Sequence, residues 1–359
     1  MQNKSRLKIW VCEYVSAGGL ASADLPASLL QEGLLMRDAL LHDLSQLSVD
    51  CITSHDARVA APDSAASIEI QPDEDVLVVW RKQLASEAID ACWVIAPETD
   101  GVLERMCQMV KDAGKRWIGC SKEAIRQTSS KSLMADICAQ AGIATIPHRY
   151  LHAAMPLPSL PWYALSQSGW VVKPDDGAGC DFTYHFNNDI ELIEFNHKYK
   201  INSAVPYAKL LLQPYLPGLP LSMSVIATKQ QVKVIAGHEQ WVNVADGQFR
   251  FQGAGVNQAA RFLPRMQAMA EKIHRAIPGL TGYWGADLIL TADNILTLVE
   301  INPRLTTPYT VLSKVLAENP ARLILDAVLN NRLLALEAES SVSLTLPSAG
   351  ATFSESLTS

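Results

Sequence analysis

A chain of 359 residues, 48% of them hydrophobic, is long enough for two or three domains with hydrophobic cores. Its formal net charge of −7 and its pI of about 5.6 give no indication of a nucleic-acid partner. The apolar runs are strand-sized and interrupted by proline or charge, which argues against a membrane span, and seven scattered cysteines are typical of reduced thiols in a cytoplasmic protein.

Short apolar segments alternate with amphipathic ones in the first third of the chain. The pattern predicts strands at residues 7–15, 49–53, 76–80, 91–95 and 117–119. It predicts helices at residues 28–47 and 102–113. Because strands that alternate with helices form parallel sheets, we expect an α/β domain built on a parallel sheet in this part of the chain.

Ser16, Gly18 and Gly19 follow directly after the first predicted strand. The glycine pair lacks the full Gly-x-Gly-x-x-Gly spacing of a dinucleotide-binding fingerprint. The segment is either a loop whose backbone amides meet a small ligand or a plain tight turn. Since open α/β sheets bind small ligands at the C-terminal ends of their strands, these three residues are candidates for substrate contacts.

A later predicted strand ends on Lys173 and runs into a loop that holds Gly177 and Gly179. Glycines let the backbone approach an oxyanion closely, and a lysine at the strand end adds a positive charge for phosphate oxygens. The Walker A pattern is absent, and an exposed turn is the alternative. Lys131 begins a predicted helix and is a second candidate for phosphate, with a solvated surface lysine as the alternative.

A predicted apolar strand breaks at a proline-punctuated bend, Gln213-Pro214-Tyr215-Leu216. A bend of this kind leaves backbone groups unpaired, and the edge of an adenine ring needs one donor and one acceptor. The carbonyl of Pro214 can accept, the N–H of Leu216 can donate, and the Gln213 amide is a further partner. The bend is therefore a candidate adenine site.

Two apolar segments flank Asp293-Asn294 near the C-terminal end, a pattern that predicts an antiparallel hairpin. With a two-residue turn there, Asp287 stands directly opposite Glu300, and side-chain alternation puts Asn302 on the same face. Opposed carboxylates destabilise a sheet, whereas a hard cation such as Mg²⁺ prefers oxygen ligands. The hairpin is therefore a candidate metal site; the alternative is a surface hairpin whose carboxylates face water.

The order and spacing of these residues resemble those of ATP-grasp enzymes. The matching positions are Lys131, Lys173 with its glycine loop, residues 213–218, Asp287 and residues 300–304. The resemblance implies a pre-ATP-grasp parallel-sheet domain over residues 1–125, followed by a two-lobed ATP-grasp fold. The first lobe would cover residues 126–212 and the second residues 213–335, with ATP clamped between them.

The resemblance also implies roles for individual residues. Those that would contact ATP are Lys131, Lys173, Gly177, Gly179, Gln213, Pro214, Tyr215 and Leu216. Those that would bind two Mg²⁺ ions, with Mn²⁺ as an alternative, are Asp287, Glu300 and Asn302. Arg304 and Lys173 would be catalytic. Many ATP-grasp enzymes bind the ribose through a glutamate where this chain has Pro220, so Asp175 or Asp176 is a candidate substitute.

Residues 13–19, 31–33, 95–101 and 302–307 resemble the tyramine–glutamate ligase family of methanofuran biosynthesis. This resemblance implies an ADP-forming ligase that joins the γ-carboxylate of L-glutamate to tyramine or a tyrosine-like amine through an acyl phosphate. The alternatives are another ATP-grasp amino-acid or peptide ligase and a non-catalytic ATP-binding sensor.

Four residues directly after the metal strand are candidates for substrate contacts: Arg304, Thr306, Thr307 and Tyr309. Arginine binds oxyanions bidentately, and threonine hydroxyls can accept from an ammonium group. The expected partners are small molecules, namely ATP, an amino acid and an amine, with a homodimer left open. Residues 336–359 are rich in Ser and Thr and are expected to be disordered.

Overall fold

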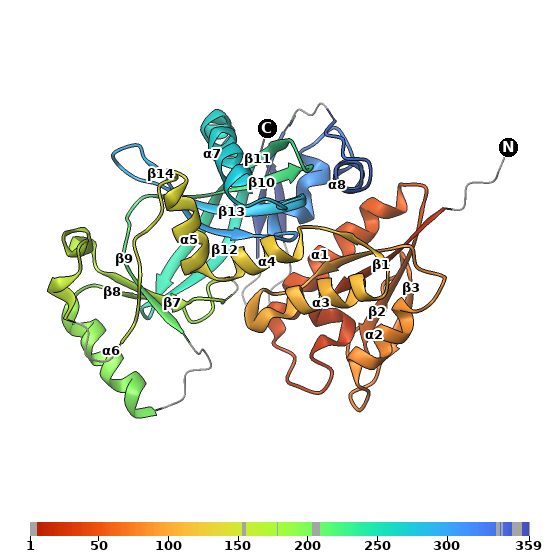
Figure 1. Cartoon of the computed structure of the whole chain (residues 1–359), viewed down its shortest axis with the longest axis horizontal. Coiled ribbons are helices and arrows are strands. Elements are labelled where there is room, and N and C mark those ends of the chain that lie inside the picture. The colour runs from red at the N-terminus through yellow and green to blue at the C-terminus, as the bar shows by residue number, and fades with distance from the viewer. Residues whose placement is uncertain are drawn as a thin grey trace.

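The computed structural model of the protein describes residues 6–152, 156–177, 179–202, 209–334, 338, 340–346 and 354–358. Within these ranges the strands form two separate sheets, one of five strands and one of eleven. Figure 1 shows the five-stranded sheet with its helices, coloured red to orange, beside the larger sheet, coloured green to blue.

The N-terminal sheet is parallel, with the strand order β3-β2-β1-β4-β5. Its strands are β1 (Leu7–Glu13), β2 (Val49–Asp56), β3 (Ala66–Ile70), β4 (Ala91–Ile95) and β5 (Arg116–Ile118). The helices of this domain are α1 (Ala27–Ser45), α2 (Val76–Leu84) and α3 (Val102–Asp112). The central strands β1 and β4 are almost wholly buried, as expected for a parallel sheet covered on both faces. The predicted parallel-sheet domain is confirmed.

The strand predicted at residues 76–80 is wrong, because this segment forms the first half of helix α2. The carboxylate of Asp75 accepts hydrogen bonds from two backbone N–H groups of the first helical turn and so caps the helix. Trp80 and Leu84, four residues apart, are buried on one helix face. A short apolar run does not by itself distinguish a strand from a helix.

The larger sheet has two antiparallel parts. The first contains β10 (Leu219–Ala227), β11 (Val232–Ala245), β12 (Gln248–Val256), β13 (Gly282–Leu290) and β14 (Leu296–Asn302). The second contains β6 (Arg149–Tyr150), β7 (Trp170–Pro174), β8 (Tyr184–Phe186) and β9 (Leu210–Pro214), with α6 (Asp189–Asn202) beside it. Among the described residues, the ladder between β12 and β8, which joins the two parts, consists of the pair Gln248 with Tyr184. The predicted lobe boundary at residue 212 falls inside β9.

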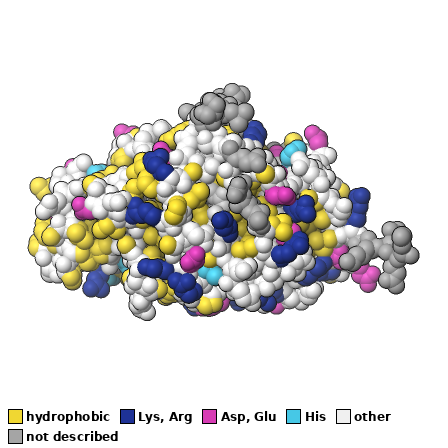
Figure 2. Space-filling view, turned by 90° about the horizontal axis from the view of Figure 1, so that it is seen from above, with side chains coloured by type: hydrophobic (Ala, Val, Ile, Leu, Met, Phe, Trp, Pro, Cys, Tyr) yellow, Lys and Arg dark blue, Asp and Glu magenta, His cyan; other side chains and the backbone are white. Residues whose placement is uncertain are grey.

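Two helices, α4 (Lys122–Ser129) and α5 (Lys131–Gln140), connect the N-terminal domain to the larger sheet. Later helical segments are α7 (Leu263–Ala276), the 3-10 helix η6 (Thr307–Lys314) and α8 (Pro320–Leu329). Figure 2 shows a face of the molecule on which hydrophobic and charged side chains are interspersed. In the ranges given above, no helix combines the length and apolar character that crossing a membrane requires.

Part of the C-terminal tail is ordered, contrary to the expectation for residues 336–359. β15 (Ser341–Thr345) pairs with the edge of β12 and with β16 (Ser354–Thr358). Val342 and Leu344 alternate along β15 and are both fully buried. These two apolar side chains compensate for the polar composition of the segment.

Candidate functional site

Asp287 and Glu300 stand directly opposite each other in the β13–β14 pair, as predicted. The turn itself was predicted wrongly, because the connecting loop covers residues 291–295 and Leu290 pairs with Leu296. A β-bulge then inserts Val299 as an extra residue on β14 and shifts the register by one position. The longer loop and the bulge compensate, so the two carboxylates meet.

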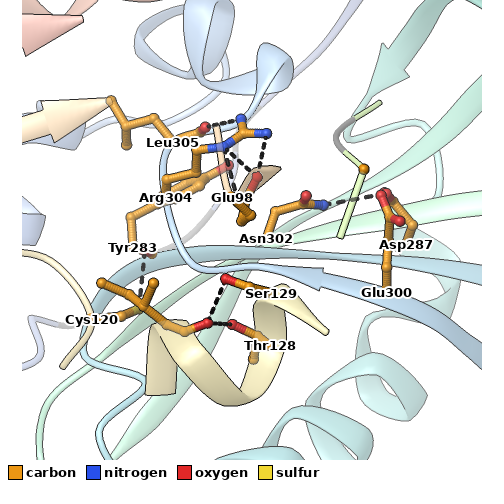
Figure 3. A network of polar contacts seen from close by, with 12 residues as sticks. Glu98, Cys120, Thr128, Ser129, Tyr283, Asp287, Glu300, Asn302, Arg304 and Leu305 are labelled. Carbon is orange, nitrogen blue, oxygen red and sulfur yellow. Dashed lines mark hydrogen bonds and ion pairs between the residues drawn. The ribbon is translucent and has the colours of Figure 1, made fainter. Parts of the chain in front are cut away.

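Two neutral amides hold the carboxylate of Asp287. Asn302 Nδ2 donates to Asp287 Oδ2 at 3.3 Å, which Figure 3 shows, and Gln240 Nε2 donates to Asp287 Oδ1 at 2.8 Å. Burial raises the pKa of Asp287 well above its usual range, and the negative charge of Glu300 adds to this effect. Burial also acts to raise the pKa of Glu300, but Lys131 and Lys173 outweigh it and lower that pKa.

Two buried lysines face the carboxylates. Lys131 Nζ lies 3.4 Å from Glu300 Oε2 and donates to the carbonyl of Gly177 in the glycine loop. Burial lowers the pKa of Lys173 to about 8, although the negative charge of Glu300 acts in the opposite direction. The structure thus brings the predicted phosphate lysines, from α5 and β7, to the predicted metal carboxylates on β13 and β14. The predicted Gly179 lies in the same loop and is exposed.

Asp175 joins these two lysine-bearing elements. It follows β7, its carboxylate accepts from Ser132 N–H at 2.8 Å, and its carbonyl accepts from Lys131 N–H at 2.9 Å. It thereby caps the start of α5 beside Lys173. Asp176 accepts from Asp100 N–H at 3.2 Å. Both carboxylates proposed as substitutes for ribose binding are therefore used to hold the protein together.

The predicted adenine bend lies at the end of β9. Gln213 is buried, whereas Tyr215 and Leu216 are partly exposed. Tyr215 N–H donates to Gly169 O at 2.9 Å, so the next pair inward, Pro214 with Trp170, is a non-hydrogen-bonded pair of the ladder. The proline therefore costs no ladder bond, and its carbonyl points away from β7.

Arg304 is paired with an acidic residue of the N-terminal domain. Its Nε lies 3.0 Å from Glu98 Oε1, its Nη2 donates to Glu98 Oε2 at 3.1 Å, and its Nη1 donates to Leu305 O at 3.1 Å (Figure 3). Burial acts to lower the pKa of Arg304, but the charge of Glu98 raises it overall. Arg304 was expected to bind an oxyanion of the substrate, and this structure gives it a buried carboxylate partner, Glu98.

The two threonines after Arg304 also have protein partners. Thr306 Oγ1 lies 2.8 Å from the hydroxyl of Tyr283, and Thr307 Oγ1 donates to Glu32 of α1. Thr306 is partly exposed, whereas Thr307 is buried. Of the two, Thr306 is the one whose side chain is better placed to reach a ligand.

The side chain of Tyr309, a predicted substrate residue, is turned into the protein. Its side chain is 1% exposed, and its hydroxyl donates to Asp43 Oδ2 at 2.8 Å. Tyr309 instead fastens η6 to α1. The 3-10 helix that begins at Thr307 buries Tyr309 together with Thr307 and Pro308, which favours a structural role for Tyr309.

The segment after β1 forms a short π-helix, η1 (Val15–Gly19). Ser16 is fully buried and its N–H donates to Glu13 Oε2 at 2.7 Å. Gly18 has a φ of 94°, and a Cβ there would lie 2.8 Å from Ile70. A Cβ at Gly19 would lie 2.5 Å from a backbone oxygen. These contacts favour the structural alternative for Ser16, Gly18 and Gly19 over direct substrate contact.

Comparisons with known proteins match both parts of the chain. A model of the pre-ATP-grasp 3 domain matches residues 49–125, and a model of the ATP-grasp domain matches residues 146–308. The chain therefore combines a pre-ATP-grasp domain with an ATP-grasp domain.

Two relatives are tyramine–L-glutamate ligases. The one from Methanocaldococcus fervens is 26% identical over 300 residues, which cover 82% of this chain and 86% of the relative. The one from Methanocaldococcus jannaschii is 25% identical over 300 residues, which cover 82% and 81%. A solved ATP-grasp superfamily protein from Archaeoglobus fulgidus has a TM-score of 0.68 at 19% identity and covers 94% of this chain and 92% of its own. At this level of identity, the similarity shows a shared fold alone.

The residues of the candidate site would suit a magnesium ion that completes its coordination shell with substrate oxygens. Within the described ranges, no group of three or more His, Cys, Asp or Glu side chains is placed to hold a metal. Mg²⁺ usually takes one or two protein carboxylates and completes its shell with water and substrate phosphates. Asp287 and Glu300 supply that number. Because Asn302 turns its Nδ2 toward Asp287, its Oδ1 is the atom left for a cation.

Sequence reasoning gave no site role to three residues that contact the candidate site: Glu32 and Glu98, which lie in segments that resemble the ligase family, and Gln240. Glu98 follows β4, at the carboxyl edge of the parallel sheet, where ligand-binding residues gather in open α/β folds. That rule could have found it. No local signal indicated Gln240, which reaches Asp287 from β11 across the intervening β10.

Proposed function

We propose that the protein joins the γ-carboxylate of L-glutamate to tyramine, or to a close analogue such as tyrosine, in the biosynthesis of a methanofuran-type cofactor. The observation that supports a phosphoryl-transfer site is that Lys131 and Lys173 lie beside the Asp287–Glu300 pair. The substrates are taken from the two tyramine–L-glutamate ligases that the chain resembles over 82% of its length.

The proposed reaction has two steps. An oxygen of the glutamate γ-carboxylate attacks the γ-phosphorus of ATP, and ADP leaves. The amine nitrogen then attacks the acyl carbon of the resulting acyl phosphate, phosphate leaves, and the nitrogen loses a proton. No side-chain nucleophile is needed, so the protein contributes positioning and charge neutralisation.

Each charged residue has a task in this scheme. Lys131 and Lys173 neutralise phosphate oxygens, and their burial strengthens that interaction because little water screens it. Asp287, Glu300 and Asn302 would hold Mg²⁺. When bound, the metal supplies positive charge to the phosphate oxygens.

Arg304 keeps donors that no residue in the described part of the chain takes. A guanidinium has five N–H groups. The contacts with Glu98 use one on Nε and one on Nη2, and Leu305 O takes one on Nη1. One N–H on each Nη atom is left, and we assign these two to an oxygen of the substrate carboxylate or of the phosphate in transfer.

Amine-dependent release of ADP by the purified protein tests the proposal. L-Glutamate would be assayed with tyramine, tyrosine and non-phenolic amines, and other acids would replace L-glutamate in parallel. We expect ADP release only when L-glutamate and a phenolic amine are both present. Turnover of another acid, with no response to L-glutamate, would refute the substrates but keep the ligase. Binding of ATP without turnover of any pair would indicate a non-catalytic sensor.

A further inference from the structure

Four polar side chains form a continuous hydrogen-bonded chain that ends at the site. His238 Nε2 lies 2.9 Å from Ser224 Oγ, which lies 2.7 Å from the hydroxyl of Tyr283. That hydroxyl lies 2.8 Å from Thr306 Oγ1. The first three side chains are buried, and Thr306 is partly exposed. The chain therefore runs from the interior of the sheet to the segment that follows Arg304.

A backbone N–H group determines which ring nitrogen of His238 carries the hydrogen. Asn257 N–H donates to His238 Nδ1 at 3.2 Å, and a backbone amide can only donate. Nδ1 is therefore the acceptor, and the ring hydrogen is on Nε2. Burial lowers the pKa of His238 to about 3, so the ring is neutral at physiological pH. His238 therefore donates to Ser224.

The donor role of His238 fixes the donor and acceptor roles in the next two hydrogen bonds. Ser224 is fully buried, and in the part of the chain described here its hydroxyl contacts only His238 and Tyr283. Because it accepts from His238, its own hydrogen goes to the oxygen of Tyr283. Tyr283 then has Thr306 as its remaining partner and donates to it. Burial raises the pKa of Tyr283 to about 12, so the phenol keeps its hydrogen.

Thr306 is left with a hydrogen that none of these partners takes. A hydroxyl that accepts one strong hydrogen bond is polarised and becomes a better donor. Its position is set by Gly285 on β13, where a Cβ would lie 2.7 Å from Thr306 Cγ2. Gly285 is two residues from Asp287 and pairs with Asn302, so Thr306 packs on the strand that carries the carboxylate site.

We propose that Thr306 donates its hydroxyl hydrogen to an oxygen of the acid substrate, and that His238, Ser224 and Tyr283 are positioning residues that fix this direction. The inference rests on the proposed function for the identity of the acid. It replaces the expectation that this threonine accepts from a substrate ammonium group. Thr306 would thereby help to select an acid.

Kinetics of Thr306→Val test the inference, since valine keeps the shape and removes the hydroxyl. We expect the KM for L-glutamate to rise about tenfold or more, as for loss of a hydrogen bond to a charged oxygen, with the KM for tyramine unchanged. Thr306→Ser keeps the donor and should restore the KM to within about threefold. A rise in the KM for tyramine alone would overturn the inference.

Two further variants sharpen the kinetic test. Tyr283→Phe removes the donor to Thr306 and should raise the KM for L-glutamate severalfold without affecting the KM for tyramine. Thr291→Val, in the loop at the opposite end of the same hairpin, is the matched control and should leave both KM values unchanged. If another acid replaces L-glutamate in the wild-type protein, the proposed substrate fails, and the same KM comparison is made with that acid.

The tautomer of His238 gives a readout that needs no turnover. Nitrogen NMR of protein labelled at its histidines should find a neutral ring with the hydrogen on Nε2 at pH 7. The signal is assigned by its shift in Ser224→Ala, which removes the acceptor of that hydrogen. A hydrogen on Nδ1, or a protonated ring, would overturn the inference whatever the substrates are.

Discussion

Arg304 and Glu98 are 206 residues apart in the sequence, yet their side chains form a buried ion pair with 3.0 Å between Nε and Oε1. Glu98 follows β4 of the N-terminal sheet, and Arg304 follows β14 of the larger sheet. The pair therefore joins the strand ends of two domains at one place. It makes the N-terminal domain part of the site.

Removal of Glu98 should destabilise the protein. Glu98→Ala leaves the guanidinium of Arg304, whose side chain is only 14% exposed, without its charged partner, and loss of one partner of such a pair typically costs about 3 kcal/mol. Urea unfolding would measure the change in the free energy of unfolding. Glu104→Ala is the control, because Glu104 pairs with a half-exposed lysine, Lys122, and should cost less than about 1 kcal/mol. Equal losses in the two variants would contradict the role given to the pair.

Glu300→Ala should abolish turnover and leave the fold intact. The substitution removes one of the two opposed carboxylates and, with it, the contact to Lys131. Loss of such an electrostatic group typically lowers kcat about 100-fold or more. Glu318→Ala, at an exposed ion pair, is the control and should keep its activity. Near-parental turnover of Glu300→Ala at saturating Mg²⁺ would refute the metal site.

Lys173→Met should raise the KM for ATP about tenfold or more, since it removes a charged donor from the phosphate oxygens. Lys122→Met is the matched control. The side chain of Lys122 is 42% exposed and pairs with Glu104 at 3.6 Å, so its replacement should leave the KM unchanged. If the two variants behaved alike, the glycine loop would not be a phosphate site.

Asp43 should make stability depend on pH. Burial raises its pKa from 3.8 to about 6, so the folded state binds a proton more tightly than the unfolded state. The free energy of unfolding therefore falls as pH rises from about 4 to about 6, by up to about 3 kcal/mol. Asp43→Asn, which can still accept from Tyr309, removes this dependence.

Comparison of Asp43→Asn with the wild type by urea unfolding checks this. We expect the variant to be more stable at pH 7.5 and equal to the wild type near pH 4. Asp73→Asn, at an exposed position, should show no pH-dependent difference. A variant that is less stable than the wild type at pH 7.5 would show that the charged form of Asp43 is favourable.

The sequence predicts the elements of this fold better than their contacts. Alternating segments predict the parallel sheet, and the hairpin pattern predicts that Asp287 and Glu300 meet. The details of that hairpin are not predictable in this way, because a longer loop and a bulge cancel in the register. Similarly, an apolar run that resembles a strand forms helix α2, and Asp75 caps its first turn.

Contacts between distant segments account for the rest. Nothing local indicates that Asp175 caps α5 or that Glu98 pairs with Arg304, since each contact joins segments that are far apart in the sequence. For Tyr309, the local pattern did not indicate the contact that forms. Its place after the metal strand indicated a substrate contact, but helix η6 turns it toward Asp43.

Trapping of the acyl phosphate with hydroxylamine tests the central claim most directly. The wild-type protein would be incubated with ATP, Mg²⁺, L-glutamate and hydroxylamine, and both ADP and glutamyl hydroxamate would be measured. We predict equal amounts of the two products, both dependent on L-glutamate and both lost in Glu300→Ala. ADP release that is independent of any acid and yields no hydroxamate would contradict carboxylate activation at the Asp287–Glu300 site.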